Sequence, residues 1–154
     1  MFISYVEKHS ERLAAIEAIL SLAEKGTVEV VTSTITITEV AFADYEKTNK
    51  ALDPEIENRI DNLWAPSSPI NLVDFHPLIA KIARDYIRQV IPIGWSLKSK
   101  DAIHLATAQQ MSVSVLHTYN DKLEKYKNLV EFRVESPQLE LGPLFEEQQP
   151  EHDK

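Results

Sequence analysis

The chain of 154 residues contains no cysteine, which excludes disulfide scaffolds, thiolate metal sites and a cysteine nucleophile. Its three glycines, Gly26, Gly94 and Gly142, are too sparse for a P-loop or for the glycine-rich turn of a dinucleotide-binding fold. No apolar run is long enough to cross a bilayer, and residues 1–9 lack the cationic and then apolar pattern of a signal peptide. We therefore expect a soluble, cytoplasmic protein that does not bind membranes.

Positive charge is also scarce, because 16 lysines and arginines face 24 aspartates and glutamates, a formal net charge of −8. Proteins that bind duplex DNA through its phosphates usually carry a basic surface, so this charge argues against a DNA-packaging or repressor role. It does not exclude a nucleic acid substrate, because acidic side chains can hold a divalent metal ion that contacts the phosphate. With 44% hydrophobic residues, the chain can bury one core of its own.

Helical and strand patterns alternate along the chain, which favours an α/β fold with a mainly parallel sheet. The spacing of apolar residues predicts helices at 10–25, 54–64, 77–90, 100–111 and 121–126, and strands at 27–32, 70–75, 113–118 and 130–134. Nothing in the sequence indicates a linker or a repeat, so we expect a single domain at 1–141. The acidic, proline-containing residues 142–154 are expected to form a disordered tail.

Polar side chains gather where the predicted strands end, and sites form at the carboxyl ends of the strands in parallel sheets. These residues are Ser33 and Glu39 after the first strand, Asp74 and His76 after the second, and Thr118, Asn120 and Asp121 after the third. Asp101 stands at the start of the helix that leads to the third strand. These polar residues mark the expected position of a site.

The most specific motif is DAIHLATA at 101–108, in which Asp101 and His104 share one face of a helix. Together with Ser33, Glu39 and the run HTYND at 117–121, it resembles the PIN-domain ribonucleases, the family that includes the toxins of VapBC-type toxin–antitoxin pairs. The resemblance extends from about residue 2 to residue 137 and implies a three-layer PIN-like fold around a mainly parallel sheet.

The resemblance also changes the interpretation of the segment after Ser33. The run STITITEV at 33–40 alternates strictly, and this period alone predicts a strand. In the PIN-like fold the same segment is a helix that carries the glutamate, so we expect a helix over 34–47. Tertiary context can override local propensity in this way.

The activity that the resemblance implies is cleavage of single-stranded or structured RNA by an endoribonuclease that depends on Mg²⁺ or Mn²⁺. Hard divalent cations prefer oxygen ligands, and a bound ion activates water and neutralises phosphate charge. Matching the motifs makes Glu39 and Asp101 the expected metal ligands. Asn120 or Asp121 supplies the last ligand, and Asp121 is favoured because it carries a charge.

The resemblance implies further roles and partners as well. Thr118 and Ser33 would hydrogen-bond the carboxylates or the attacking water. A toxin of this kind would be held by a small antitoxin protein, and such toxins commonly form homodimers. Lysines near the two motifs, such as Lys98 and Lys100, are either a local basic rim for RNA or ordinary surface residues.

Each candidate residue also has an ordinary structural explanation. Asp101 complements the dipole at a helix N-terminus, and Ser33 can cap a helix. Asn120 and Asp121 form a typical turn pair. We expect His104 to be packed or hydrogen-bonded within the fold rather than catalytic. The other histidines show no spacing typical of a zinc site.

The N-terminus departs from the family pattern. PIN domains begin with an apolar strand in the middle of the sheet, which ends in a metal-binding aspartate and precedes a segment like FISYVE at 2–7. The sequence starts at Met1, where that segment begins, so we expect the first strand and its aspartate to be missing from this chain. Two explanations stay open: the native protein is longer, or it is a catalytically inactive PIN-like module that binds RNA or protein.

An unrelated phosphoacceptor receiver domain is a further alternative. That fold requires a lysine at the end of a late strand, whereas the strand predicted at 113–118 ends in His117 and Thr118. The sequence therefore disfavours a receiver domain.

Overall fold

The computed structural model describes residues 1–138, and the tail expected at 142–154 lies outside these residues. The helices are α1 (Phe2–Val6), α2 (Ser10–Glu24), α3 (Ile35–Glu39), α4 (Asp44–Asn49), α5 (Pro54–Trp64), α6 (Pro77–Val90), α7 (Ser99–Gln110) and α8 (Asp121–Glu124), with short 3₁₀ turns η1 (Ile91–Ile93) and η2 (Lys127–Leu129). The strands are β1 (Val30–Ser33), β2 (Ile70–Val73), β3 (Val115–His117) and β4 (Arg133–Glu135). The fold is α/β, as predicted.

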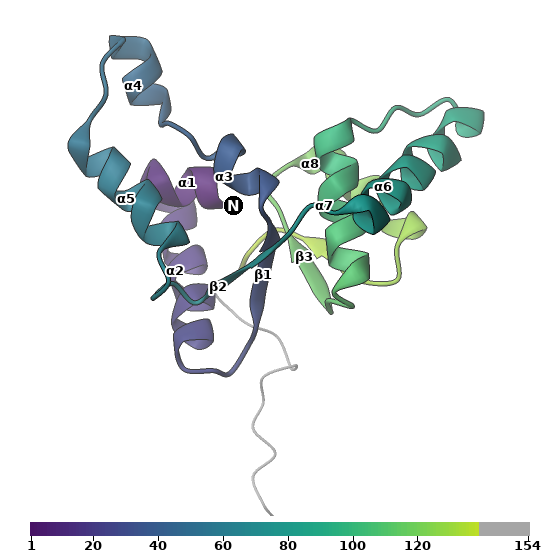
Figure 1. The fold of residues 1–154 in the computed structure, drawn as a ribbon, viewed down its shortest axis with the longest axis horizontal. Coiled ribbons are helices and arrows are strands. Elements are labelled where there is room, and N and C mark those ends of the chain that lie inside the picture. The colour runs from purple at the N-terminus through teal and green to yellow at the C-terminus, as the bar shows by residue number, and fades with distance from the viewer. Residues whose placement is uncertain (139–154) are drawn as a thin grey trace, which may run out of the picture.

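The four strands form two separate parallel pairs. β1 pairs with β2, with Val30 opposite Ile70, and β3 pairs with β4, with Val115 opposite Arg133. The predicted parallel arrangement is therefore confirmed, but the described strands make two small sheets rather than one continuous sheet. Figure 1 shows β1 and β3 in the middle of the molecule, with α1, α2, α4 and α5 on one side and α6, α7 and α8 on the other.

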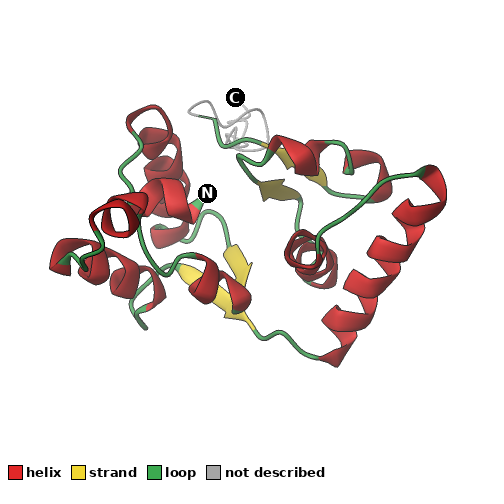
Figure 2. Cartoon of the chain, turned by 90° about the horizontal axis from the view of Figure 1, so that it is seen from above, coloured by secondary structure: helices red, strands yellow, loops and turns green. Residues whose placement is uncertain are grey.

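Each sheet packs against its own hydrophobic core, which divides the fold into an N-terminal half (residues 1–73) and a C-terminal half (residues 77–135), seen side by side in Figure 2. The N-terminal core consists of Phe2, Val6, Ile16, Leu20, Val40, Ala43, Ile56, Leu63 and Ile70. The C-terminal core consists of Ile79, Ala83, Tyr86, Val90, Leu97, Ala102, Leu105, Ala106, Ala108, Leu123, Tyr126, Phe132 and Val134. The halves meet where α7 packs on β1, and where the Arg12 guanidinium lies 4.4 Å from the centre of the Tyr119 ring.

Two of the longer helices begin and end at the predicted residues because the sequence carries clear start signals. The Asp53 side chain accepts hydrogen bonds from the backbone N–H groups of Glu55 and Ile56, and Pro54 follows as the first residue of α5. His76 caps α6 through a hydrogen bond that its Nδ1 accepts from the Leu78 N–H, again followed by a proline. Proline suits this position because the first helical N–H needs no partner within the helix.

The single helix expected over 34–47 is wrong in its length. The residues form α3 and α4, separated by an irregular link at 40–43, while Glu39 is carried on a helix as expected. Val40 and Ala43 in the link are each 2% exposed and belong to the N-terminal core, and Val40 has a non-helical backbone with φ −105° and ψ 51°. The non-helical angles of Val40 end α3, and α4 begins at Asp44 as a separate helix.

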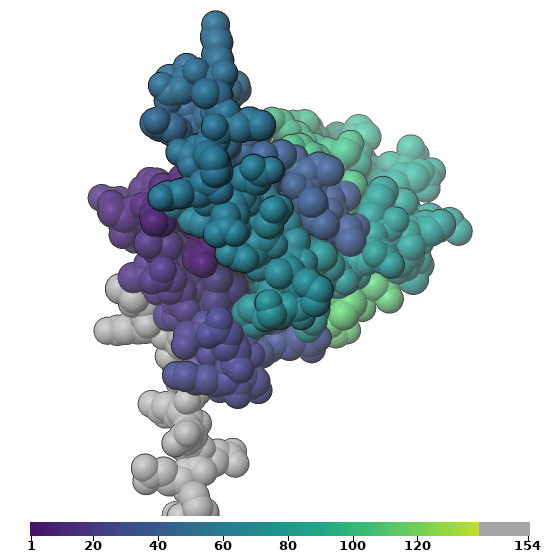
Figure 3. Space-filling view, turned by 60° about the vertical axis from the view of Figure 1, so that its left-hand side comes forward, coloured from purple at the N-terminus to yellow at the C-terminus, as the bar shows by residue number. Residues whose placement is uncertain are grey.

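The link is fixed by a buried glutamate. The two carboxylate oxygens of Glu46 accept hydrogen bonds from the backbone N–H groups of Ala43, at 3.1 Å, and Asp53, at 2.8 Å. These bonds hold α4 against the start of α5, and this part of the chain stands out from the rest of the surface at the top of Figure 3. None of the described helices is long and apolar enough to cross a membrane.

Candidate active site in the groove between the two sheets

A groove of about 900 Å³ lies between the two halves, lined by β1, β3, α7 and the first residues of the chain. Five of the six residues expected in the site line this groove, namely Ser33, Glu39, Asp101, Thr118 and Asn120. The sixth, Asp121, is the first residue of α8, is exposed and is not among the lining residues. The fold therefore brings most of the expected site to one place.

Glu39 is the last residue of α3, and both of its carboxylate oxygens are bound by α7. Oε2 lies 2.6 Å from Nε2 of His104, and Oε1 lies 3.2 Å from Nζ of Lys100. The two partners are four residues apart and therefore share one face of α7. Because the Glu39 side chain is only 17% exposed, these contacts fix a carboxylate of the N-terminal half against a helix of the C-terminal half.

These neighbours keep Glu39 ionised. The hydrogen bond with His104 lowers the pKa of Glu39 below its ordinary value, burial of the carboxyl group opposes this shift, and the charges of His104 and Lys100 add to the lowering. Glu39 is thus a carboxylate at neutral pH. An ionised carboxylate is a suitable ligand for a divalent metal ion, although Lys100 and His104 would compete with the ion for the two oxygens.

Asp101 lies in the first turn of α7 and is contacted by the turn that follows β3. Its Oδ1 accepts a hydrogen bond of 3.4 Å from Nδ2 of Asn120. Asn120 is itself held twice, because its backbone N–H donates to Oγ1 of Thr118 at 3.0 Å and its Oδ1 accepts from the Lys122 N–H at 3.2 Å. Of the two residues considered for the last position, Asn120 is the one that the structure places beside Asp101.

Ser33 is fully buried at the end of β1, where its hydroxyl oxygen accepts a hydrogen bond of 3.4 Å from the Ile35 N–H. The neighbouring hydroxyl groups of Thr32 and Thr36 lie 2.8 Å apart and link β1 to α3. Ser33 therefore helps to hold the junction between β1 and α3, whereas the N-cap residue of α3 is Thr34, whose side chain makes no capping hydrogen bond.

The groove offers a small set of oxygen ligands. Among residues 1–138, no three histidine, aspartate or glutamate side chains lie close enough together to hold a metal ion. Glu39 and Asp101 nevertheless face the same groove, and proteins usually hold Mg²⁺ through one or two carboxylates, with water and substrate phosphate as the other ligands. The donor set fits an ion of this class, which when bound activates water and neutralises phosphate charge.

The comparison with known families decides what kind of domain this is. A family model of the PIN domain matches residues 1–129. The chain belongs to the PIN domain family. PIN domains are generally nucleases and typically use divalent metal ions, which agrees with the pair of carboxylates in the groove. Neither a search of the curated proteins nor a search of the solved structures found a match.

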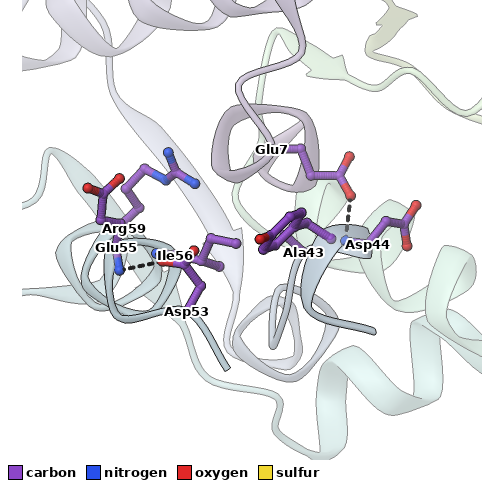
Figure 4. A pocket seen from close by; sticks show the side chains of 8 residues that line it. Glu7, Ala43, Asp44, Asp53, Glu55, Ile56 and Arg59 are labelled. Carbon is purple, nitrogen blue, oxygen red and sulfur yellow. Dashed lines mark hydrogen bonds between the residues drawn. The ribbon is translucent and has the colours of Figure 1, made fainter. Parts of the chain in front are cut away.

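A second pocket of this PIN domain, of about 390 Å³, lies at the end of α1 and the starts of α4 and α5 (Figure 4). Its acidic side chains serve the backbone: Glu7 accepts from the Asp44 N–H at 3.2 Å, and Asp53 accepts from the Glu55 N–H at 2.8 Å. None of the expected site residues lines this pocket. We therefore place the candidate active site in the groove.

The sequence analysis did not predict that Lys100 and His104 would bind the two carboxylate oxygens of Glu39. His104 is hydrogen-bonded within the fold, as expected, but its partner was not identified. The available signal was the spacing of four residues between Lys100 and His104 on the helix that also carries Asp101. That spacing predicts a shared helix face, while the acidic partner comes from a segment 65 residues away.

Proposed function

We propose that this PIN domain is a divalent-metal-dependent endoribonuclease that cleaves single-stranded or structured RNA. The observation that carries the proposal is the position of two carboxylates in one groove, with Glu39 at the end of α3 and Asp101 in the first turn of α7. In the proposal Glu39 and Asp101 bind Mg²⁺ or Mn²⁺. Asn120 takes the third position of the site in place of Asp121, because it contacts Asp101 while Asp121 is exposed.

The other groove residues have supporting roles in this proposal. Thr118 fixes Asn120, and Asn120 orients the Asp101 carboxylate toward the ion. The Lys100 side chain is 68% exposed beside Glu39, so its ammonium can turn to a phosphate oxygen of the RNA when a metal ion binds to Glu39. Ser33 keeps the junction between β1 and α3 in place.

We further propose that the protein is the toxin of a toxin–antitoxin pair, a cytoplasmic homodimer in which a small antitoxin covers the groove. The motifs at 101–108 and 117–121 support this role through their resemblance to VapC-type toxins. Co-purification of a small protein encoded beside this chain, which blocks RNA cleavage when bound, is the expected result. An active nuclease whose gene has no such neighbour would contradict the toxin role alone.

Asp101→Asn tests the proposed active site. The substitution removes one carboxylate charge but keeps the size of the side chain, so we expect Mn²⁺-dependent cleavage of single-stranded RNA to fall at least about 100-fold. Asp61→Asn is the matched control, because Asp61 is an exposed carboxylate on α5 and does not line the groove. Cleavage by the Asp101 variant at the rate of the control would refute the assignment of the site.

A catalytically inactive RNA- or protein-binding module is the second candidate. It is favoured by the absence of a three-carboxylate cluster among residues 1–138, and by the fact that Lys100 and His104 already bind both oxygens of Glu39. This candidate predicts RNA binding that a chelator does not change. It also predicts that neither the unaltered protein nor the Asp101 variant cleaves RNA in the presence of Mn²⁺.

A further inference from the structure

The two halves of the molecule differ in charge. Residues 1–73 contain six lysines and arginines against twelve aspartates and glutamates, whereas residues 77–135 contain nine against six. Five of these nine cations are exposed lysines in two short segments, 95–100 and 121–127, namely Lys98, Lys100, Lys122, Lys125 and Lys127. A polyanion is therefore attracted to this part of the C-terminal half, although the chain as a whole is acidic.

Two of these lysines connect the candidate active site to an aromatic side chain. Asn120, which contacts Asp101, accepts a hydrogen bond of 3.2 Å from the Lys122 N–H. Lys125 is the C-cap residue of α8 and has helical backbone angles, so it shares a face with Lys122 three residues earlier. Its ammonium lies 5.4 Å from the centre of the Trp95 ring. These contacts form a path from Asp101 along α8 to Trp95.

Trp95 is held firmly by the fold, although it is 39% exposed. Its backbone N–H donates to the carbonyl oxygen of Val90 at 3.0 Å, and Gly94 provides the left-handed turn before it, with φ 74°. Its ring meets that of the buried Tyr126 edge to face, with centres 5.9 Å apart, and the Tyr126 hydroxyl donates to the carbonyl oxygen of Ser96. The fold thus presents a partly exposed aromatic ring in a fixed position.

An exposed aromatic ring among lysines is typical of surfaces that bind single-stranded nucleic acid. Unpaired bases stack on such rings, and cations along the path bind the phosphates. The ammonium of the exposed Lys125 can leave the ring for a phosphate when a base arrives. Six residues separate Trp95 from Asp101, so their Cα atoms lie at most about 22 Å apart. One short RNA strand can therefore contact both.

We propose that Trp95 stacks on an unpaired base of the RNA, while Lys122 and Lys125 bind phosphates between this base and the carboxylates of Glu39 and Asp101. The identity of the ligand rests on the proposed nuclease function, and the stacking position is an addition to it. Bases within a duplex are already stacked and paired, so this position favours a single strand. The C-terminal half thus selects the strand that reaches the metal-binding carboxylates.

The first experiment measures binding without cleavage. A fluorescein-labelled single-stranded RNA of about 12 nucleotides, within the usual range of site sizes, is mixed with the full chain in EDTA, and fluorescence anisotropy gives the affinity. Trp95→Ala should weaken binding about tenfold because the stacked base loses its partner, and Trp95→Phe should restore most of the affinity because it keeps a ring. The same RNA annealed to its complement should bind the unaltered protein and Trp95→Ala equally.

Tryptophan fluorescence locates the stacked base. The chain has two tryptophans, and Trp64 lies in the N-terminal half, where its ring packs against that of Phe2. Trp64→Phe leaves Trp95 as the only tryptophan, and saturating RNA should quench the fluorescence of this variant. RNA should leave the fluorescence of Trp95→Phe unchanged. A thermal unfolding curve checks that each variant is folded.

Matched variants separate stacking and phosphate contacts from general effects. Ile93→Ala removes apolar surface from the same loop, because Ile93 is 54% exposed, and it should leave the affinity for RNA unchanged. Lys125→Met should reduce the slope of log affinity against log salt concentration by about 0.7, the value for one phosphate contact with a single strand. Lys25→Met should leave the slope unchanged, because Lys25 is an exposed residue at the end of α2 in the N-terminal half.

Several results would overturn the proposal. These are the absence of RNA binding, equal losses of affinity in the Ile93 and Trp95 variants, and unchanged Trp95 fluorescence with RNA. If Trp95→Ala keeps its affinity for RNA but changes the oligomeric state, the loop is instead a protein interface.

Failure of the nuclease function gives a different result. RNA that binds through Trp95 but is not cleaved with Mn²⁺ would contradict the nuclease and leave the stacking position intact. If the protein does cleave RNA, Trp95→Ala should raise KM with little change in kcat. Cleavage by this variant with an unchanged KM would refute the stacking position and leave the nuclease.

Discussion

The two halves of the molecule contribute to the candidate site in different ways. The C-terminal half supplies Asp101, Thr118 and Asn120, and the hydrogen bonds that orient these residues lie within that half. The N-terminal half supplies one carboxylate, Glu39, from a helix of five residues, and its oxygens are held by α7 of the other half. The C-terminal half thus orients its site residues by contacts of its own, whereas the position of Glu39 depends on how the two halves pack together.

The largest expected effect comes from breaking one core at a time. Leu105 in the C-terminal core and Ile16 in the N-terminal core are both fully buried, so replacing either with alanine should lower the free energy of unfolding by about 2–5 kcal/mol. Urea unfolding measures the loss. Because the cores are separate, hydrogen exchange should accelerate mainly in the half that carries the substitution.

Leu52→Ala is the control for this pair, because Leu52 is 81% exposed and its truncation should change stability by less than about 0.5 kcal/mol. Equal acceleration of exchange in both halves by either core substitution would show that the two cores unfold as one unit. The two halves would then not differ in when they unfold, although their cores are separate in the structure.

A smaller effect is expected from breaking the polar contact between the halves. Glu39→Gln removes the charge that His104 and Lys100 bind, and we expect a loss of about 1–2 kcal/mol at pH 7, measured by urea unfolding. The same substitution should abolish metal-dependent activity. Glu57→Gln is the control, because Glu57 is an exposed residue of α5.

The effect of Glu39→Gln should depend on pH. The folded protein lowers the pKa of Glu39, so the carboxylate stabilises the fold above its ordinary pKa of 4.5 and this contribution is lost as the pH falls through the lowered value. The difference in stability between the unaltered protein and the variant should therefore shrink in acid. A difference that stays constant from pH 7 to below the lowered pKa would mean that the charge of Glu39 does not contribute.

The elements with local signals were predicted well from the sequence. α5 and α6 match their predicted residues because a capping side chain and a proline mark each start, at Asp53–Pro54 and at His76–Pro77. The break between α3 and α4 was not predicted, because the link between them is held by tertiary hydrogen bonds, from the backbone N–H groups of Ala43 and Asp53 to the Glu46 carboxylate. The separation of the strands into two pairs is also a tertiary feature, which no periodicity encodes.

The site shows the same limit. The resemblance to PIN domains pointed to Glu39, Asp101, Thr118 and Asn120, all of which line the groove. It did not separate Asn120 from Asp121, because the choice depends on which side chain leaves the turn toward α7, and charge alone favoured the exposed residue. The set of metal ligands therefore stays a prediction. It is best tested by replacing Lys100, whose charge would compete with a metal ion for Glu39.

Lys100→Met gives the smallest expected change in stability and the sharpest test of the link between the halves. Because the Lys100 side chain is 68% exposed, losing its contact with Glu39 should cost less than about 1 kcal/mol. Removing this positive charge should instead strengthen Mn²⁺ binding by about 1 kcal/mol, or roughly fivefold in Kd, measured by calorimetric titration. Lys98→Met, at an exposed position that does not line the groove, should leave the Kd unchanged. If both variants bind Mn²⁺ as the unaltered protein does, then Glu39 is not a metal ligand and its bonds to α7 only join the two halves.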